Sequence, residues 1–445
     1  MATRGRHLVR ADRRFATGGG LLGQLIAPAY ERIVDQIDRR LLSGGIDSIL
    51  PAGEARRVGF HGDGPVAIVH LKRWRALVRL AVSGSVGWYK AWELGEWSSP
   101  DPVKVFEVFA VNARSLGDTG RAKGPFRLAN ALAHRLRDNA PRKARRNIEA
   151  HYDLGNDFYS AWLDETMTYS AARFSPLPHA GGEEPRGGEG EGLSARDMPS
   201  PNPSREREGN LEAAQRRKMS NLLDRLDLQH GQRLLEIGCG WGSLAIAAAD
   251  RGVSVVGLTL STEQKAWADQ RIAEAGFSDK IEIRLQDYRA TDDRFDAIAS
   301  VEMAEAVGER WWGAYLDCIA RNLKPGGRAA LQYISIDHAL FQRYRRGADF
   351  IQTYIFPGGM LIDEPSFEAL GAERGLALSD RDGFALDYAE TLKSWRERYD
   401  EAVGRGALAG FDAAFHRLWR YYLMYCEGGF RGRAIDVAQI TLTKA

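Results

Sequence analysis

The sequence predicts an α/β protein, with a doubly wound, mostly parallel sheet preceded by a smaller α+β domain. Three observations support this fold class. A glycine-rich turn joins a buried strand to a helix at residues 234–249, strand-like and helix-like segments alternate across residues 211–340, and a helical opening precedes short strands in residues 1–125. Alternating strands and helices form a parallel sheet with helices on both faces. Ligands of such sheets bind beyond the carboxyl ends of the strands.

The glycine-rich turn predicts a nucleotide-type site. Glu236 is followed by Gly238, Gly240 and Gly242, and glycine permits positive φ and leaves no Cβ between backbone and ligand. The next helix begins with unpaired N–H groups that can meet a ligand. The E-x-G-x-G-x-G spacing differs from the dinucleotide pattern, which needs an acidic residue about 20 positions further on. It resembles motif I of class I methyltransferases, which implies that these four residues hold the methionine half of S-adenosylmethionine. The alternative is a turn without a ligand.

Further candidates follow the other strands of the predicted sheet. Four more strands are predicted from apolar runs at residues 253–258, 281–285, 295–301 and 328–334. Asp287 and Tyr288 come directly after the strand at 281–285 and are expected to meet the adenine of the cofactor. Most methyltransferases of this class end the second strand on an acidic residue that binds ribose. This chain has Thr259, Leu260 and Gln264 in that region instead.

This departure and several longer blocks resemble the cyclopropane-fatty-acyl-phospholipid synthase family, which includes the mycolic acid cyclopropane synthases. The blocks lie at residues 145–159, 164–170, 257–264, 349–359 and 430–439. The resemblance covers residues 145–174 and 211–443, and it implies a seven-stranded Rossmann-like methyltransferase sheet with S-adenosylmethionine as cofactor. It places Tyr169 and Ser170 in a loop that closes over the cofactor, and Thr259, Leu260 and Gln264 in the region that binds ribose.

The chain is expected to divide into four regions. They are an N-terminal α+β domain for lipid access and dimerisation (1–125), a basic helical connector with the cofactor-closing segment (126–174), a disordered low-complexity insertion (175–210) and a methyltransferase domain with lipid-tunnel insertions (211–445). The insertion is rich in Gly, Pro, Ser and Glu, a composition typical of disorder. Within the first region, strands are predicted at residues 57–60, 66–71 and 76–81. Three tryptophans between residues 86 and 97 are expected in its core rather than on a membrane.

Composition and charge favour a protein that reaches lipid from the membrane surface. The 445 residues carry 61 basic and 59 acidic side chains, so no overall field attracts nucleic acid. Arginine-rich clusters at residues 4–14 and 135–146 favour contact with anionic lipid, with a solvated face as the alternative. No run reaches the roughly 18 apolar residues of a membrane span, and the first residues lack the apolar core of a secretory signal. The three cysteines lack metal-ligand spacing. We therefore expect a cytoplasmic protein, peripheral to the inner face of the membrane and without metal.

The reaction of the family defines what the site needs. A cis double bond attacks the sulfonium methyl group, a carbocation forms on the acyl chain, and a base takes a proton from the transferred methyl so that a cyclopropane closes. The resemblance implies bicarbonate as that base, held by a polar cluster. Glu305, Tyr388 and Ile334 match three positions of the cluster, but Ala171 replaces its cysteine and Gln332 its histidine. An amide can still donate to an anion, whereas an alanine side chain cannot.

These two replacements leave alternatives for the base and the product. Glu305 or Tyr388 takes the proton if bicarbonate is absent, and Glu302 is the other candidate. The expected substrate is the unsaturated acyl chain of a membrane phospholipid, and the expected product is a cyclopropane fatty acid. Loss of a proton from a neighbouring carbon would give a methyl- or methylene-branched chain. A protein that binds cofactor and lipid without catalysis is the remaining alternative.

Overall fold

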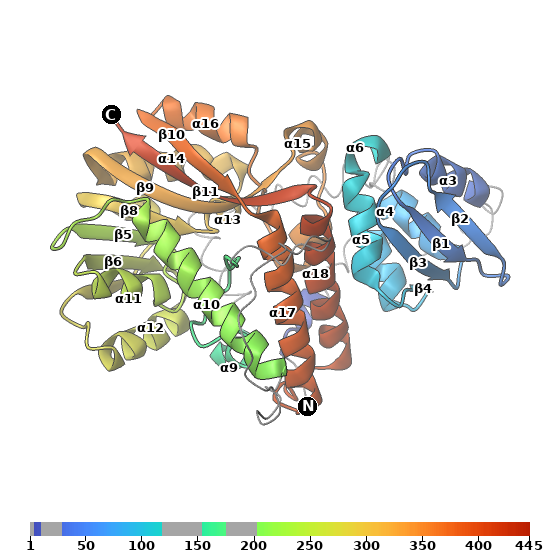
Figure 1. Ribbon diagram of the computed structural model, residues 1–445, viewed down its shortest axis with the longest axis horizontal. Coiled ribbons are helices and arrows are strands. Elements are labelled where there is room, and N and C mark those ends of the chain that lie inside the picture. Colours follow the sequence, from blue (N-terminus) through green and yellow to red (C-terminus); the bar gives the residue numbers. More distant parts are fainter. Residues whose placement is uncertain (1–3, 10–28, 118–153, 175–202) are drawn as a thin grey trace, which may run out of the picture.

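The computed structural model describes residues 4–9, 29–117, 154–174 and 203–445. These residues form a small domain with a four-stranded sheet and a larger domain built around a seven-stranded sheet (Figure 1). Residues 135–146 of the predicted basic connector and residues 175–202 of the predicted insertion lie outside the described residues. The expected boundaries at 125, 174 and 210 therefore stay predictions.

The large sheet confirms the predicted fold class, with the strand order β10-β11-β9-β8-β5-β6-β7. Strands β5 to β9 pair in parallel, and β11 runs antiparallel to both β9 and β10. The strands are β5 (Arg233–Ile237), β6 (Ser254–Thr259), β7 (Ile281–Leu285), β8 (Phe295–Val301), β9 (Leu323–Ile336), β10 (Leu376–Gly383) and β11 (Ile435–Lys444). The first five agree with the apolar runs in the sequence, because a parallel sheet is covered on both faces.

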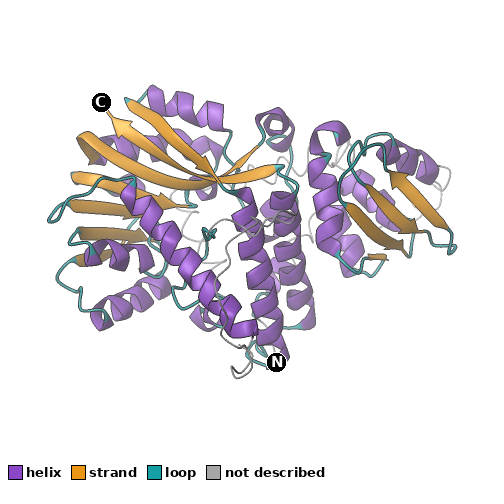
Figure 2. Cartoon of the chain, in the orientation of Figure 1, coloured by secondary structure: helices purple, strands orange, loops and turns teal. Residues whose placement is uncertain are grey.

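Helices cover both faces of this sheet (Figure 2). One face carries α10 (Pro203–Asp224), α11 (Ser243–Asp250) and α12 (Thr262–Glu274), and the other carries α14 (Trp312–Asn322) and α16 (Glu364–Ala372). Neighbouring residues of β5 point to opposite faces of the sheet. Leu234 packs in the apolar layer beneath α10, α11 and α12, and Leu235 packs in the apolar layer on the other face, beneath α14 and α16. Both are fully buried, which places the carboxyl end of β5 inside the domain.

Two long helices, α17 (Ala385–Gly404) and α18 (Ala413–Arg431), stand side by side between the large sheet and the small domain (Figure 1). The connecting segments contain α1 (Arg6–Val9), α9 (Asn156–Ser160), η2 (Tyr288–Ala290), α13 (Ala304–Val307), η3 (Glu309–Trp311), α15 (His338–Tyr344) and the π-helical turn η4 (Ile351–Ile355). Most of these segments lie beyond the carboxyl ends of the parallel strands, where a ligand of such a sheet binds.

The small domain is α+β. Its sheet has the order β2-β1-β3-β4, with β1 and β3 parallel. Its elements are α3 (Ala29–Asp38), β1 (Gly45–Ile49), β2 (Ala55–Gly59), β3 (Val66–Leu71), α4 (Arg75–Glu93), β4 (Trp97–Ser98), α5 (Pro102–Val111) and α6 (Ala113–Leu116). The strand predicted at 76–81 is wrong, because these residues lie in α4. Ala76, Leu77 and Leu80 are its buried residues there, a spacing that fits one helix face better than the alternation of a strand.

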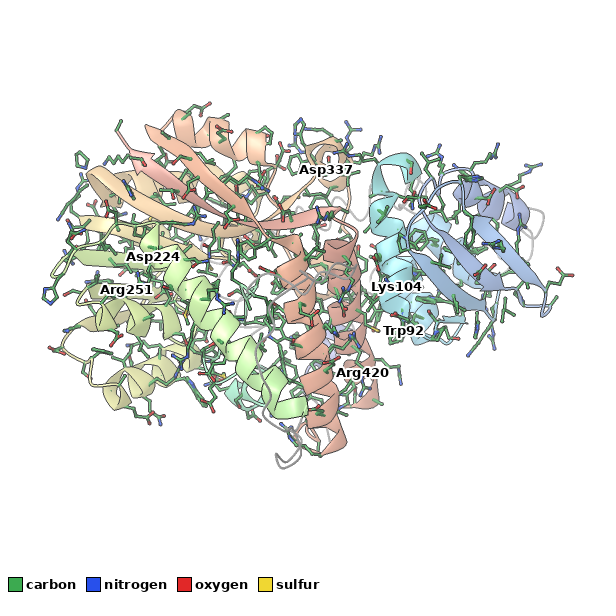
Figure 3. All side chains as sticks on the ribbon, viewed as in Figure 1. Trp92, Lys104, Asp224, Arg251, Asp337 and Arg420 are labelled. Atoms are coloured by element: carbon green, nitrogen blue, oxygen red, sulfur yellow. The ribbon has the colours of Figure 1, made fainter. Side chains whose placement is uncertain are left out.

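The small domain packs firmly against α18. Tyr89 of α4 lies 5.0 Å from Phe350 and 4.9 Å from Tyr421 between ring centroids. Trp92, labelled in Figure 3, lies 5.3 Å from Tyr421. At the other end of the boundary Arg114 Nε donates to Asp337 Oδ2 at 2.7 Å. Asp337 is labelled in Figure 3. Because this interface is aromatic and buried, the small domain forms a fixed wall beside the larger one.

Two absences hold for the described ranges alone. None of their helices is long and apolar enough to cross a bilayer. Within the same ranges, no group of three or more His, Cys, Asp or Glu side chains is arranged to hold a metal ion.

Candidate active site

A cavity of about 920 Å³ lies beyond the carboxyl ends of the parallel strands. Ile237 of β5, Thr259 of β6 and Val301 of β8 line it at those ends, together with Ile334 of β9. It continues to the small domain, where Phe106 of α5 forms part of its wall. The cavity therefore joins the glycine-rich turn to the interface between the domains.

The three glycines of the turn have different roles. Their φ values are 84° at Gly238, 51° at Gly240 and 86° at Gly242. A Cβ on Gly240 would meet no atom within 4 Å, so this residue opens onto the cavity that it lines. Gly238 also lines the cavity, but Gly242 does not; a Cβ there would lie 3.2 Å from Ala268 of α12. Gly242 thus allows α11 to pack closely on α12, and its cofactor contact stays a prediction.

Two buried ionisable side chains lie beside the turn. Glu236 is 3 % exposed, and its Oε2 atom has no hydrogen-bond partner. Burial raises the pKa of Glu236 to about 8. Lys218 of α10 is 1 % exposed and donates to Ser170 Oγ at 2.7 Å, and burial lowers its pKa to about 8. A carboxyl group with an unused acceptor fits a cationic ligand such as the ammonium group of the expected cofactor.

The predicted ribose and adenine residues lie on the same cavity. Thr259, Leu260, Gln264, Asp287 and Tyr288 all line it. Thr259 Oγ1 donates to Gln264 Oε1 at 2.9 Å, which fixes the side chain at the start of α12. Asp287 Oδ1 accepts from the backbone N–H of Arg289 at 3.0 Å and so caps η2. Nothing in this geometry conflicts with the sequence prediction for these five residues.

The closing loop supplies two more predicted residues. Tyr169 and Ser170 line the cavity. The hydroxyl groups of Tyr169 and Tyr422 lie 2.8 Å apart, which ties the loop to α18. Ser170 accepts the hydrogen bond from Lys218. Both residues are therefore held by side chains that sequence reasoning did not single out.

A polar cluster stands where β8 and β9 end, and Glu302 is its centre. Glu302 Oε1 accepts from the Ala171 backbone N–H at 2.8 Å and from Gln332 Nε2 at 2.9 Å. Its Oε2 accepts from the Tyr388 hydroxyl at 2.7 Å. Glu302 lines the cavity and has a φ of 50°, a conformation uncommon for residues other than glycine. One carboxylate thus takes all three of these hydrogen bonds.

The other predicted members of the cluster take different positions. Glu305 Oε1 accepts from the Ile334 backbone N–H at 3.2 Å, and its Oε2 has no hydrogen-bond partner. Burial, followed by the nearby charge of Glu302, raises the pKa of Glu305 well above its usual range. Gln332 does not line the cavity, and its amide is oriented by Gln439, whose Nε2 donates to Gln332 Oε1 at 3.1 Å. The structure therefore brings Tyr388 and Gln332 to Glu302 rather than to Glu305.

Four residues of this arrangement were missed or given a secondary place in the sequence analysis. Glu302 was weighed only as an alternative base, and Lys218, Tyr422 and Gln439 were not considered. A buried lysine in an amphipathic helix carries no pattern that separates it from the exposed lysines of other helices. The aromatic ring of Tyr354 packs 4.8 Å from that of Tyr89, and Tyr354 does not line the cavity.

Comparison with known proteins identifies the family. The family described as mycolic acid cyclopropane synthetase matches residues 139–440. The tuberculostearic acid methyltransferase UfaA1 of Mycobacterium tuberculosis is 40% identical over 371 residues, covering 82% of this chain and 80% of its own. The cyclopropane-fatty-acyl-phospholipid synthase of Escherichia coli is 34% identical over 333 residues, covering 71% of this chain and 76% of its own.

Solved structures agree with the fold and with the cofactor. The mycolic acid cyclopropane synthase CmaA1, determined with SAH and CTAB, has a TM-score of 0.56 and 30% sequence identity, covering 67% of this chain and 98% of its own. S-Adenosylmethionine is therefore the cofactor, and its methionine half fits Gly240 and the unused oxygen of Glu236. The chain belongs to the cyclopropane synthase family, whose members are S-adenosylmethionine-dependent methyltransferases acting on lipid chains.

Proposed function

We propose that the protein adds one carbon to the cis double bond of an unsaturated acyl chain in a membrane phospholipid, forming a cyclopropane. The observation that carries this proposal is the position of the Glu302 cluster. It lies on the same cavity as the glycine-rich turn and the apolar residues of the interface. A proton acceptor therefore stands beside the region that receives the methyl group. The cofactor supplies an electrophilic methyl group on its sulfonium.

The side chains around the cluster suit a cationic reaction. The rings of Tyr169, Tyr388, Tyr422 and Phe430 line the cavity, and aromatic faces stabilise a nearby positive charge. Tyr388 stacks on Phe430 with ring centroids 4.4 Å apart, so its hydroxyl is held in one orientation. Such rings also keep water away from a carbocation that water would trap.

The part of the cavity next to the small domain, here called the far arm, suits an acyl chain with an anionic head group. Leu80, Phe106 and Phe109 of the small domain line this arm. Arg343 of α15 and the nearby Arg346 also line the cavity, and no ion pair joins either of them to another described residue. A guanidinium group binds phosphate oxygens in a fork geometry. We infer that the apolar arm holds the acyl chain and that these arginines meet the phosphate of the lipid.

A branched product is the second candidate, because a relative at 40% identity is named a tuberculostearic acid methyltransferase. Both products begin with the same methyl transfer and differ in which proton leaves. Ring closure requires a proton from the transferred methyl group, whereas a double bond in the product requires the loss of a proton from carbon next to the cation.

Lipid analysis separates these products. The gene is expressed in a host rich in monounsaturated phospholipid, and fatty-acid methyl esters are examined by mass spectrometry and NMR. A gain of one CH₂ with cyclopropane proton signals supports the proposal. A retained double bond with an added carbon supports the branched product, and unchanged lipid would exclude both.

We also propose that the protein works in the cytoplasm at the inner face of the membrane, as a homodimer. Most of the exposed large apolar side chains among the described residues belong to the small domain, including Leu42, Ile49, Val66, Ile68 and Leu94. Apolar side chains close to basic ones favour anionic bilayers. Sedimentation with vesicles of anionic and neutral phospholipid tests membrane binding. Sedimentation velocity without lipid tests the dimer.

A further inference from the structure

We propose that the Glu302 carboxylate replaces bicarbonate as the base, so that this protein carries its own proton acceptor and needs no added anion. This inference deepens the proposed function and rests on it. The residues present do not fit a bicarbonate ion held as the family resemblance implies. The donors expected to hold such an ion already bind a carboxylate of the chain itself.

The hydrogen-bond donors that would hold bicarbonate already bind Glu302. The Ala171 N–H and the Gln332 amide both donate to Glu302 Oε1, at 2.8 and 2.9 Å, and the Tyr388 hydroxyl donates to Oε2 at 2.7 Å. A carboxylate and a bicarbonate present the same planar pair of oxygens to such donors. Both oxygens of Glu302 are engaged, so a second anion would find these hydrogen bonds taken and a like charge beside it.

The donor groups of Gln332 and Tyr388 are oriented toward the Glu302 carboxylate. Gln439 Nε2 donates to Gln332 Oε1 at 3.1 Å, so the amide of Gln332 turns its N–H₂ group toward Glu302. The two glutamines face each other across β9 and β11. The Tyr388 hydroxyl is a donor, and burial raises its pKa well above its usual range. Tyr388 is therefore a positioning residue for the carboxylate and not the base.

The backbone conformation at Glu302 is unusual. Its φ of 50° lies in the left-handed region that favours glycine. The backbone N–H of Glu302 donates to the Gln332 carbonyl at 2.7 Å, which holds β8 and β9 together at this point. A large side chain in such a conformation is uncommon, and residues of this kind cluster at active sites. The same geometry means that glycine is well tolerated at position 302.

The surrounding charges distinguish Glu302 from the neighbouring Glu305. Burial raises the pKa of Glu302, and the hydrogen bonds from Ala171, Tyr388 and Gln332 oppose that rise. The positive charge of buried Lys218 opposes it as well, because a buried carboxylate needs a balancing cation. The nearby Glu305 has no such donors on its Oε2, and burial together with the charge of Glu302 raises its pKa well above its usual range. Two neighbouring acids in one apolar site favour a single negative charge, and the hydrogen bonds favour that charge on Glu302. Glu302 is the member that can accept a proton.

A cyclopropane forms in two steps, a methyl transfer and then a proton transfer to Glu302. The π electrons of the double bond form a C–C bond to the methyl carbon, and the S–C bond breaks with its electron pair going to sulfur. The neighbouring chain carbon becomes cationic. A Glu302 oxygen then forms an O–H bond with a proton of the transferred methyl group. The C–H electron pair closes the ring, and the proton later passes from Glu302 to solvent.

The test compares full-length variants with purified monounsaturated phospholipid vesicles and cofactor, in CO₂-free buffer with and without bicarbonate. Wild type is expected to turn over equally well in both buffers. Glu302→Gln keeps the shape but removes the charge, and we expect a ~10²–10⁴-fold loss of kcat, typical of a lost base, with cofactor affinity unchanged. Glu309→Gln is the matched control, because Glu309 pairs with Arg345 at 2.7 Å and does not line the cavity.

Glu302→Gly provides the second variant, since glycine suits the backbone there. It exposes the donors of Ala171, Gln332 and Tyr388, and we expect its activity to return when bicarbonate, formate or acetate is added. Glu302→Gln should show no such rescue, because its side chain still fills the position.

Two results would overturn the inference. One is a wild-type rate that falls several-fold when bicarbonate is removed. The other is a Glu302→Gln variant with near wild-type kcat. In both cases wild type still modifies lipid, so the proposed function stands. Wild type that modifies no unsaturated lipid in either buffer would refute the proposed function itself.

Discussion

Binding of the cofactor should release a proton from Glu236. This carboxyl group is buried at the glycine-rich turn, and burial raises its pKa to about 8. A group with this pKa is about 90 % protonated at pH 7. When a cationic ligand binds beside its unused oxygen, the carboxylate becomes the favoured form. We therefore expect roughly 0.9 proton released per cofactor bound at pH 7 and about 0.1 at pH 9.

The sign and size of the effect on affinity follow from the same pKa. The protonated carboxyl must be ionised before it pairs with the ligand, which at one unit below the pKa costs about 1.4 kcal/mol. Relative to a Glu236→Gln variant, in which the ammonium group of the cofactor and Lys218 titrate as in wild type, affinity should therefore rise about tenfold between pH 7 and pH 9 and level off above pH 8.

Calorimetry in buffers of different ionisation enthalpy measures the released proton directly. The ammonium group of the cofactor and Lys218, whose pKa is also about 8, contribute to the total. A Glu236→Gln variant shares these two contributions, so the difference between variant and wild type isolates Glu236. Equal proton release from both proteins would refute the role of Glu236.

Four further outcomes are expected. Gly240→Val should abolish cofactor binding in calorimetry, because it fills the open space at a φ of 51°; retained affinity would argue against the turn as the site. Lys218→Met should move the rising limb of the pH–rate profile upward, since loss of the cation raises the pKa of Glu302. Glu305→Gln should lose at least tenfold less kcat than Glu302→Gln, because Glu305 accepts one backbone hydrogen bond and its Oε2 has no donor; the reverse order would make Glu305 the base. Ala171→Cys should give no bicarbonate-dependent gain in wild type but a larger bicarbonate response in a Glu302→Gly background.

The sequence was sufficient for the fold, and most of the residues that it predicts for the cofactor line one cavity, because local chemistry encodes both. Glycines at a strand end and apolar runs of strand length depend on neighbouring residues only. The strand predicted at 76–81 failed for the opposite reason. Over six positions its apolar residues are compatible with both the alternation of a strand and the repeat of a helix. The helix forms because α4 packs inside the small domain.

The position of β11 shows what local patterns leave out. This strand lies between β9 and β10 although it is last in the sequence. Only this insertion brings Gln439 opposite Gln332. A sequence without coordinates offers no signal for that pair, and so the orientation of the Gln332 amide could not be predicted.

The identity of the base was open in the sequence because Glu302 and Glu305 lie three residues apart. In a regular helix they would face the same side, and their roles could not be separated by spacing. The chain is not helical at this point, since Glu302 has a φ of 50° and α13 begins only at Ala304. This turn sends Glu302 toward Ala171 and Tyr388 and sends Glu305 toward the backbone of Ile334.

The two replacements that seemed to weaken the site form one arrangement with this turn. Alanine at position 171 contributes only its backbone N–H to the carboxylate, and glutamine at position 332 contributes a neutral donor. Because the Gln332 amide is neutral, Lys218 is the cation whose charge acts on Glu302. A protonated imidazole at position 332 would add a second cation and lower the basicity of the carboxylate further. The substitutions at 171 and 332 therefore favour a carboxylate that still accepts a proton at neutral pH, which is the property that a base in this position requires.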